Sequence, residues 1–182
     1  MNEELAVLLE ITMRLASAKI AYMVTGSLAM ALYAVPRMTR DIDIIIEISL
    51  ADVVKLVSAF ADEYYYDEDT VRDAIQRHGM FNLIHQRTVV KIDFIVRKEE
   101  AYRVEEFARR RQIMVEGQAI WSVAPEDLIL SKLIWAEDSR SELQLRDVHN
   151  LLTVAQHIDF SYLRCWAARL GIDRQLEQVI DA

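Results

Sequence analysis

Hydrophobic side chains recur along the chain with two different periods. From Glu3 to Ala18 apolar residues return every three or four positions, which predicts an amphipathic helix. Residues 41–48 are rich in isoleucine, a β-branched residue that favours strands. The apolar run Ala21–Val24, the sequence Thr25-Gly26-Ser27 and the helix-forming residues up to Tyr33 predict a strand, a tight turn and a helix. The beginning of the chain therefore mixes helices with strands.

The mixed pattern continues through the middle of the chain and then gives way to helices alone. Further helices are predicted at 49–60, 69–78 and 99–110, and further strands at 80–85, 88–96, 111–115 and 118–123. From Pro125 onward the pattern is helical, with later helices predicted at 141–156, 160–170 and 172–180. This order predicts an α+β fold, with an α/β core at 1–123 and a helical C-terminal extension at 124–182, packed as a single compact unit.

Length and composition exclude several classes of protein. The chain has 182 residues, of which 53% are hydrophobic, as expected for one folded domain. A single cysteine excludes an internal disulfide framework. The N-terminus is acidic and lacks the basic region of a signal peptide, and no apolar run approaches the roughly 20 residues of a membrane span. We therefore expect a cytoplasmic protein that does not bind a membrane.

The charge pattern leaves two interpretations of the basic residues open. A net charge of -8 argues against a generally basic, nucleic-acid-binding surface. Arginines and lysines nevertheless form local clusters, at Arg37 and Arg40, at Lys91, Arg97 and Lys98, and at 109–111. Each cluster is either a solvated surface or a patch that binds RNA.

Three aspartates occupy unusual positions in the predicted strands. Side chains alternate between the two faces of a strand, so Asp41 and Asp43 point to the same side. Asp93 lies among strongly apolar neighbours in a later strand, on the same face as Lys91 and Ile95. Neighbouring carboxylates repel each other, and burial strengthens this effect. If the two strands are adjacent, the acids converge on one place, where Mg²⁺ would be bound by their oxygens and keep positions for water and phosphates.

Simpler interpretations of these residues stay open. Asp41 can cap the entry of its strand, and Asp43 can pair with Arg37 or Arg40. The turn upstream favours the metal interpretation, because Gly26 lets the backbone approach a ligand and a helix N-terminus attracts an anion. Ser27 can also be an ordinary N-cap. Together the turn and the acids suit a nucleoside triphosphate (NTP) with Mg²⁺.

This set of motifs resembles the nucleotidyltransferase superfamily, which has the DNA polymerase β-like fold. Within it, the sequence is similar to the bacterial AbiEii-type, or DUF6036-like, group, which includes abortive-infection toxins. The motifs are Gly26-Ser27, Asp41-x-Asp43 and Asp93, with weaker matches at Pro125-Glu126-Asp127-Leu128, Lys132 and Arg146-Asp147. The resemblance implies a nucleotidyltransferase-like mixed β-sheet flanked by helices.

The resemblance also implies roles for individual residues. Asp41, Asp43 and Asp93 would hold two Mg²⁺ (or Mn²⁺) ions, and Asp93 would help to deprotonate the nucleophile. Gly26 and Ser27 would hold the β- and γ-phosphates. The remaining candidates near the nucleotide are Arg40, Lys132 and Asp147. Lys132 interrupts an apolar stretch, so its ammonium contacts either the triphosphate or Asp147; both interpretations stay open.

Two functional hypotheses follow. The first is a Mg²⁺-dependent, pyrophosphate-releasing nucleotidyltransferase that moves a nucleoside monophosphate from an NTP, ATP included, to a hydroxyl acceptor. The acceptor would be a tRNA 3′ end, a protein or a small molecule, and the enzyme would be a toxin of an abortive-infection or toxin–antitoxin system with a cognate antitoxin partner. The alternative is a non-catalytic nucleotide-binding or toxin–antitoxin partner module with the same fold. The sequence sets no oligomeric state.

Other residues give weaker signals. The four histidines (His78, His85, His149 and His157) show no metal-binding spacing. Cys165 lies beside Trp166 among helix-forming residues, and we expect it to be a buried thiol without a catalytic partner. The run Tyr64-Tyr65-Tyr66 either packs beside a strand or stacks on a base. There is no P-loop motif.

Overall fold

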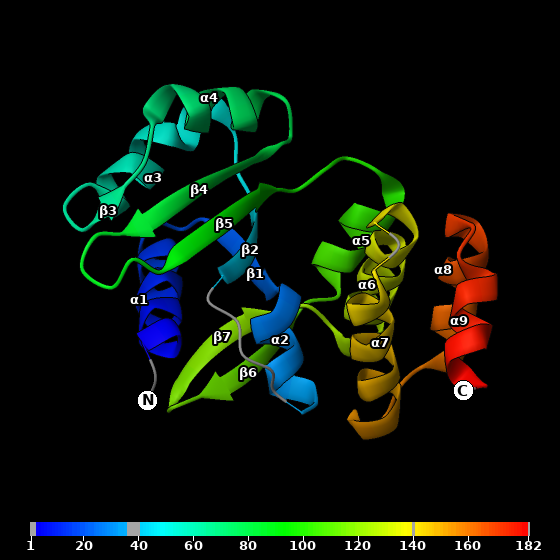
Figure 1. Cartoon of the computed structure of the whole chain (residues 1–182). Helices are drawn as coiled ribbons and strands as arrows, with labels where there is room; N and C mark the ends of the chain where they lie inside the picture. The colour runs from blue at the N-terminus through cyan, green and yellow to red at the C-terminus, as the bar shows by residue number, and fades with distance from the viewer. Residues whose placement is uncertain (1–2, 36–40, 140, 182) are drawn as a thin grey trace.

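The strands form one mixed sheet that contains two parallel pairs. The computed structural model describes residues 3–35, 41–139 and 141–181, and in this part of the chain the sheet has seven strands in the order β3-β4-β5-β2-β1-β7-β6 (Figure 1). The strands are β1 (Ala21–Thr25), β2 (Asp41–Glu47), β3 (Tyr64–Tyr65), β4 (Met80–His85), β5 (Lys91–Val96), β6 (Arg111–Val115) and β7 (Gln118–Ser122). β2 pairs with β5 and β1 with β7 in parallel, and the other neighbours pair antiparallel.

The helices divide between the two faces of this sheet. They are α1 (Glu3–Ser17), α2 (Gly26–Tyr33), η1 (Leu50–Asp52), α3 (Val53–Phe60), α4 (Glu68–Gln76), α5 (Ala101–Ala108), α6 (Pro125–Ser139), α7 (Glu142–Val154), α8 (Phe160–Leu170) and α9 (Asp173–Ile180). α1 packs on β1, β2 and β7 and contacts α3, which in turn contacts α4. α2 lies against the other face, where it meets α6 and α7 (Figure 1).

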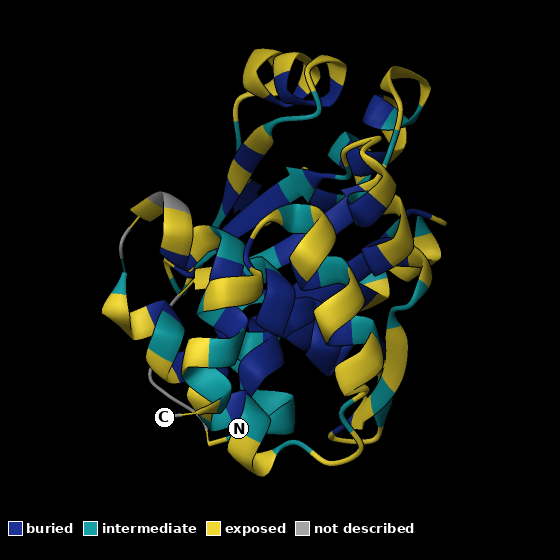
Figure 2. Cartoon of the chain, turned by 90° about the vertical axis from the view of Figure 1, so that its right-hand side faces the viewer, coloured by how far each residue is buried: buried dark blue, intermediate teal, exposed yellow. Residues whose placement is uncertain are grey.

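Alternation along β2 separates the hydrophobic core from the candidate site. Ile42, Ile44 and Ile46 are fully buried on one face, whereas Asp41 and Asp43 share the opposite face. The burial view shows the same division, with buried residues along the sheet and exposed ones on the outer surfaces of the helices (Figure 2). The isoleucines therefore fix which face β2 turns to the core, and this fixes where the acids point.

Most of the predicted elements are confirmed. The first helix, the isoleucine-rich strand, the hairpin predicted at 80–85 and 88–96, and the helical end of the chain lie where the pattern places them, within a few residues. β3 was not predicted as a strand, because two residues are too short for a periodic signal. In the described residues no helix is both long enough and apolar enough to cross a membrane. The division of the chain at 123/124 stays a prediction.

Two expectations about single residues are wrong. Cys165 is exposed rather than buried, because α8 turns Leu163 and Ala167 to the interior and Cys165 lies midway between them, on the other side of the helix. Ser27 is not an N-cap: α2 begins at Gly26 with Thr25 as its N-cap, so Ser27 lies in the first turn. The backbone N–H groups of this first turn have no partner within the helix itself.

The arginine cluster at 109–111 packs against buried acids and aromatic rings. Arg109 lies 3.0 Å from the fully buried carboxylate of Asp127, and its guanidinium stacks 3.7 Å from the ring centre of Tyr162. Arg111 pairs with buried Glu126 at 3.1 Å. Arg110, the residue between these two arginines, stacks on the rings of Phe107 and Trp121. Arg109 and the exposed Arg111 thus neutralise two buried acids of α6, so the cluster is not a free basic patch.

Candidate active site

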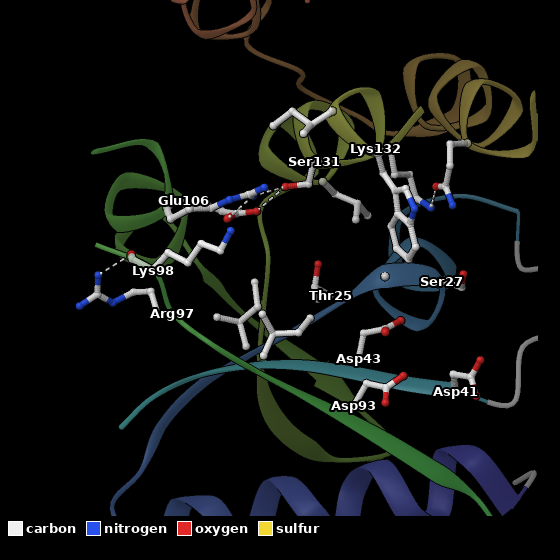
Figure 3. A pocket seen from close by; sticks show the side chains of 18 of the residues that line it. Thr25, Ser27, Asp41, Asp43, Asp93, Arg97, Lys98, Glu106, Ser131 and Lys132 are labelled. Atoms are coloured by element: carbon white, nitrogen blue, oxygen red, sulfur yellow. Dashed lines mark hydrogen bonds and ion pairs between the residues drawn. The ribbon is translucent and has the colours of Figure 1, made fainter. Parts of the chain in front are cut away.

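The three aspartates lie on one face of two adjacent parallel strands. Asp43 of β2 is directly opposite Asp93 of β5, and Asp41 is opposite Lys91. Their side chains point to the same side of the sheet, toward the helix that carries Lys132 (Figure 3). The condition that the two strands are adjacent is therefore met, and the role of the three acids as a metal site stays a prediction.

Burial makes this arrangement electrostatically unfavourable without a cation. Burial, together with the negative charges of Asp93 and Asp41, raises the pKa of Asp43 to about 6. Asp93 is almost fully buried: its Oδ2 accepts a hydrogen bond of 2.7 Å from Lys91, and its Oδ1 has no hydrogen-bond partner. A buried carboxylate oxygen without a partner is rare in folded proteins, and it marks a position where a ligand or an ion is expected.

Gly26 brings the N-terminus of α2 against these acids. Thr25, the last residue of β1, pairs with Asp43, so the helix starts directly beside the carboxylate. Gly26 has φ +66°, a left-handed conformation, and a Cβ at this position would overlap the Asp43 carboxylate. The first turn of α2 contains no acidic side chain. Its N–H groups therefore remain suited to an anion beside the acids.

Lys132 lies above the acids and is held by two partners from α7. Its Nζ donates to Asp147 Oδ2 at 2.6 Å and to Gln144 Oε1 at 3.1 Å, and both charged groups are buried. The positive charge of Lys132 acts in the opposite sense to the acids and lowers the pKa of Asp43. Lys132 thus pairs with Asp147 and also faces the carboxylates, so the two interpretations of this lysine are compatible.

These groups line a single cavity of about 570 Å³. One end holds Gly26, Ser27, the three aspartates and Lys132, with Trp135 and Gln144 nearby on the helical side. The other end is lined by Arg97, Lys98, Arg103, Glu106 and Ser131 (Figure 3). Ile45 and Ile95, which follow Asp43 and Asp93 on the same face of their strands, also line the cavity, as does Leu128. The cavity is therefore acidic at one end and basic at the other.

The donor set fits a hard divalent cation, although no closed metal site is preformed. Carboxylate oxygens are the ligands of Mg²⁺ and Mn²⁺, and Asp93 Oδ1 is an unsatisfied one. Across the described ranges, no three acidic, histidine or cysteine side chains are already gathered closely enough to hold an ion. Binding therefore requires rotation of carboxylates on strands that already place them side by side.

The remaining predicted residues have mixed outcomes. Asp147 contacts Lys132 but does not line the cavity. Arg40 lies outside the described residues, as does Arg37. Sequence reasoning gave no role to Gln144, Trp135, Arg103, Glu106 or Ser131, since nothing in the local pattern marks residues from α5, α6 and α7 that converge only in three dimensions.

A polar network closes the basic end of the cavity. Arg103 Nη1 donates to Glu106 at 2.8 Å and to Ser131 Oγ at 2.7 Å, and the Ser131 hydroxyl donates to Glu106 Oε1 at 2.6 Å. Glu106 is fully buried and both of its oxygens have donors. The network therefore joins α5 to α6 and holds the Arg103 guanidinium against the cavity wall.

Comparison with known proteins agrees with this geometry. The chain has the fold of an antigenic nucleotidyltransferase-like protein from Paracoccidioides brasiliensis (TM-score 0.60, 16% identity, covering 100% of this chain and 94% of that one). It is also similar to the lincosamide antibiotic adenylyltransferase LnuA bound to lincomycin (TM-score 0.58, 14% identity, 85% and 98%). A third similar structure is ANT(2")-Ia in complex with adenylyl-2"-tobramycin (TM-score 0.60, 13% identity, 93% and 98%).

At these identities the structural likeness shows the fold alone. No curated protein sequence matches the chain. The model of the DUF6036 family, whose description is a nucleotidyltransferase of unknown function, matches residues 3–173. The finer assignment to the AbiEii-type group stays a prediction. Nearly the whole chain is covered by the family model, and the protein therefore belongs to the DUF6036 family of nucleotidyltransferases.

Proposed function

We propose that this protein transfers a nucleoside monophosphate from an NTP to a hydroxyl acceptor and releases pyrophosphate. The proposal is supported above all by one observation: Asp43 and Asp93 lie opposite each other, directly beside the glycine that opens α2. A pair of carboxylates beside a helix N-terminus suits a metal-bound triphosphate. The carboxylates offset the positive charge of the metal ion, and the helix N-terminus offsets the negative charge of the phosphates.

The acids would hold the catalytic cation. Asp41, Asp43 and Asp93 are the proposed ligands of Mg²⁺ or Mn²⁺. The bound ion would supply Lewis-acid activation at the α-phosphate and neutralise the charge of the leaving pyrophosphate. Without it, the NTP would add negative charge to a site where burial and like charges already hold the pKa of Asp43 at about 6.

The first turn of α2 would bind the phosphates that leave. Gly26 and Ser27 lie in this turn and line the cavity beside Asp43. Lys132 would add a positive charge on the opposite wall, where Asp147 and Gln144 fix the position of its ammonium. A fixed ammonium needs no reorganisation when charge moves to the leaving group, and such preorganised charges lower the barrier most effectively.

Asp93 is the proposed proton acceptor for the attacking hydroxyl. Its Oδ1 is unpartnered, whereas Oδ2 is held by Lys91. The hydrogen bond to Asp93 raises the pKa of Lys91, so this lysine stays charged and keeps the carboxylate oriented. One oxygen is thereby fixed and the other is left for the substrate.

Labelled NTPs test this function directly. The protein is incubated with each NTP, Mg²⁺ and a cell lysate or total RNA, and transferred label and pyrophosphate are measured. We expect transfer by the wild type, loss with EDTA and loss in Asp43→Ala, with Asp62→Ala as the matched control because Asp62 is exposed and outside the cavity. Equal transfer by Asp43→Ala and the wild type would contradict the proposal.

The alternative of a non-catalytic binding module predicts a different result. It predicts nucleotide or partner binding without Mg²⁺-dependent pyrophosphate release, and tolerance of Asp93→Asn. The roles as a toxin and as the partner of an antitoxin stay predictions, and expression of wild-type protein and of Asp43→Ala in a bacterial host tests them. Growth arrest by the wild type alone would favour the toxin.

A further inference from the structure

The sheet face that carries the acids continues past Asp93 onto two more strands. Asn82 of β4 pairs with Asp93, and Ile84 pairs with Lys91. Tyr65 of β3 pairs with Ile84. Since paired residues of neighbouring strands point to the same side of a sheet, all of these side chains share the face of Asp93.

This part of the sheet is open to solvent, in contrast to its other face. We call it the open face and define it by Tyr65, Met80, Asn82, Ile84 and Lys91. Tyr65 is 66% exposed and Met80 58% exposed, and Asn82 is also exposed. The alternate residues of these strands, including Tyr64, Phe81 and Leu83, are buried on the face that α4 covers. α4 packs against β4 and so supports these strands from the face opposite the open face (Figure 1).

The geometry of phosphoryl transfer places the acceptor on this side. Thr25, Asp43, Asp93 and Asn82 form one row across four neighbouring strands. The attacking and leaving oxygens lie roughly in line on opposite sides of the transferred phosphorus. With the leaving pyrophosphate at α2, at the Thr25 end of the row, the attacking hydroxyl comes from the Asn82 end.

The state of Asp93 agrees with this direction of attack. Asp93 lies on β5, the strand that borders the open face. Its Oδ1 has no hydrogen-bond partner, and its Oδ2 accepts a hydrogen bond from Lys91. The carboxylate therefore stands between the phosphate site on one side and an uncovered surface on the other. Its Oδ1 is unpartnered but buried, so the carboxylate has to rotate toward a hydroxyl delivered along that surface to accept its proton.

The chemistry of the open face indicates what carries the hydroxyl. An exposed tyrosine ring offers a stacking surface that accepts any base. Lys91 and the exposed Arg87, in the turn between β4 and β5, offer positive charge to phosphates, and Asn82 offers a donor and an acceptor. Tyr65 lies two strands from Asp93, about 10 Å across the sheet, so a ligand that touches both is extended.

We propose that the open face binds the end of a single-stranded nucleic acid, with a base stacked on Tyr65 and the terminal hydroxyl beside Asp93. The inference rests on the proposed function, and it names the class of the acceptor. A small antibiotic is usually enclosed by its pocket, whereas this surface is open and elongated. Its stacking ring, amide and cations match those of proteins that bind single strands.

The step balances with the groups present. The terminal hydroxyl oxygen forms a bond to the α-phosphorus of the NTP, while the bond from that phosphorus to the oxygen bridging to the β-phosphate breaks. The electron pair of the broken bond leaves with pyrophosphate. The hydroxyl proton passes to Asp93 and then to water, and the strand is longer by one nucleotide.

Binding of labelled oligonucleotides tests the inference without any need for transfer. Fluorescence anisotropy is measured with short single-stranded RNA, single-stranded DNA and a blunt duplex, in the presence of Mg²⁺ and no NTP. We expect Tyr65→Ala to weaken single-strand binding roughly 5- to 100-fold, since a stacked base contributes about 1–3 kcal/mol, while Tyr65→Phe keeps most of the affinity. Phe160→Ala removes an exposed aromatic ring from α8 and serves as the matched control.

The outcomes separate this inference from the proposed function. Strand affinity that is equal in the wild type and Tyr65→Ala, or tighter binding of the duplex, would overturn the inference, even if label is transferred to a protein or a small molecule. Tyr65-dependent strand binding without transfer to any acceptor would leave the inference standing and would overturn the proposed function. The RNA and DNA arms identify which strand is bound. An increase in melting temperature caused by NTP and Mg²⁺, equal in the wild type and Tyr65→Ala, shows that the nucleotide site is intact.

Discussion

Asp43 and Asp93 lie directly opposite each other on adjacent parallel strands. Their carboxylates face one space, and burial together with this like charge raises the pKa of Asp43 to about 6. The folded protein therefore holds a proton on Asp43 more tightly than the unfolded chain does, for which the pKa is 3.8. Charge repulsion at this site destabilises the metal-free protein at neutral pH, as is common where function needs a strained arrangement.

Asp43→Asn is therefore expected to stabilise the metal-free protein at neutral pH. The stability that Asp43 provides is fully present below its unfolded pKa of 3.8 and is lost as pH rises through about 6. Urea unfolding in EDTA should show a larger gain for Asp43→Asn at about pH 7.5 than at about pH 5. Mg²⁺ should raise the melting temperature of the wild type but not of the variant. A variant less stable than the wild type at neutral pH would contradict the proposed charge repulsion.

Gly26→Ala should abolish nucleotide transfer while the protein still folds. The left-handed backbone at φ +66° is strained for alanine, by about 1–3 kcal/mol, and the new Cβ would displace the Asp43 carboxylate. Gly117→Ala is the matched control, because Gly117 has φ +81° with no atom near its Cβ position. Urea unfolding should show a loss of stability in both variants, larger in Gly26→Ala because of the overlap with Asp43, whereas only Gly26→Ala should lose transfer. Normal transfer by a folded Gly26→Ala would count against the placement of the phosphates at α2.

Lys132 should have separable roles in stability and in transfer. Breaking the buried pair by Asp147→Ala leaves an uncompensated charge, which costs about 3–5 kcal/mol. Replacing both partners, as in Lys132→Met with Asp147→Leu, should recover most of this stability because neither charge of the pair remains. The double variant should still transfer no label, since the ammonium beside the phosphates is gone. Full activity in the double variant would mean that Lys132 is only structural.

The arginines at 109–111 should matter for folding and not for nucleic-acid binding. Arg109→Met leaves the buried Asp127 without its cation, and we expect a loss of about 3–5 kcal/mol in urea unfolding. Single-strand affinity of the folded variant, measured by fluorescence anisotropy, should stay at the wild-type value. A large loss of single-strand affinity with little loss of stability would mean that this cluster binds nucleic acid.

Local periodicity explains which parts of the fold were predictable. Alternation in β2 places Asp41 and Asp43 on one face whatever the tertiary structure is, so this part of the site follows from the sequence. The pairing of β2 with β5 does not, because β3, β4 and two helices intervene along the chain and nothing local specifies the partner strand. The sequence therefore predicts that Asp93 lies beside the other acids only if the two strands are adjacent.

Side chains that meet across elements were the least predictable. Arg109 and Asp127 each look like surface residues of separate helical segments, and only the packing of α5 against α6 pairs them. Tyr64 and Tyr65 are neighbours in a two-residue strand and point to opposite faces of the sheet, so Tyr65 is exposed and Tyr64 is buried in the core. Such differences depend on which face of the sheet is covered, and a short strand gives no periodic signal for it.

Anomalous diffraction from crystals soaked with Mn²⁺ and a non-hydrolysable NTP analogue tests the central claim most directly. We expect Mn²⁺ peaks between the Asp43 and Asp93 carboxylates, at about 2 Å from their oxygens, with analogue phosphates against the first turn of α2. Analogue bound with no metal peak near these aspartates, or metal bound only elsewhere on the chain, would contradict the claim that the paired acids hold the catalytic cation.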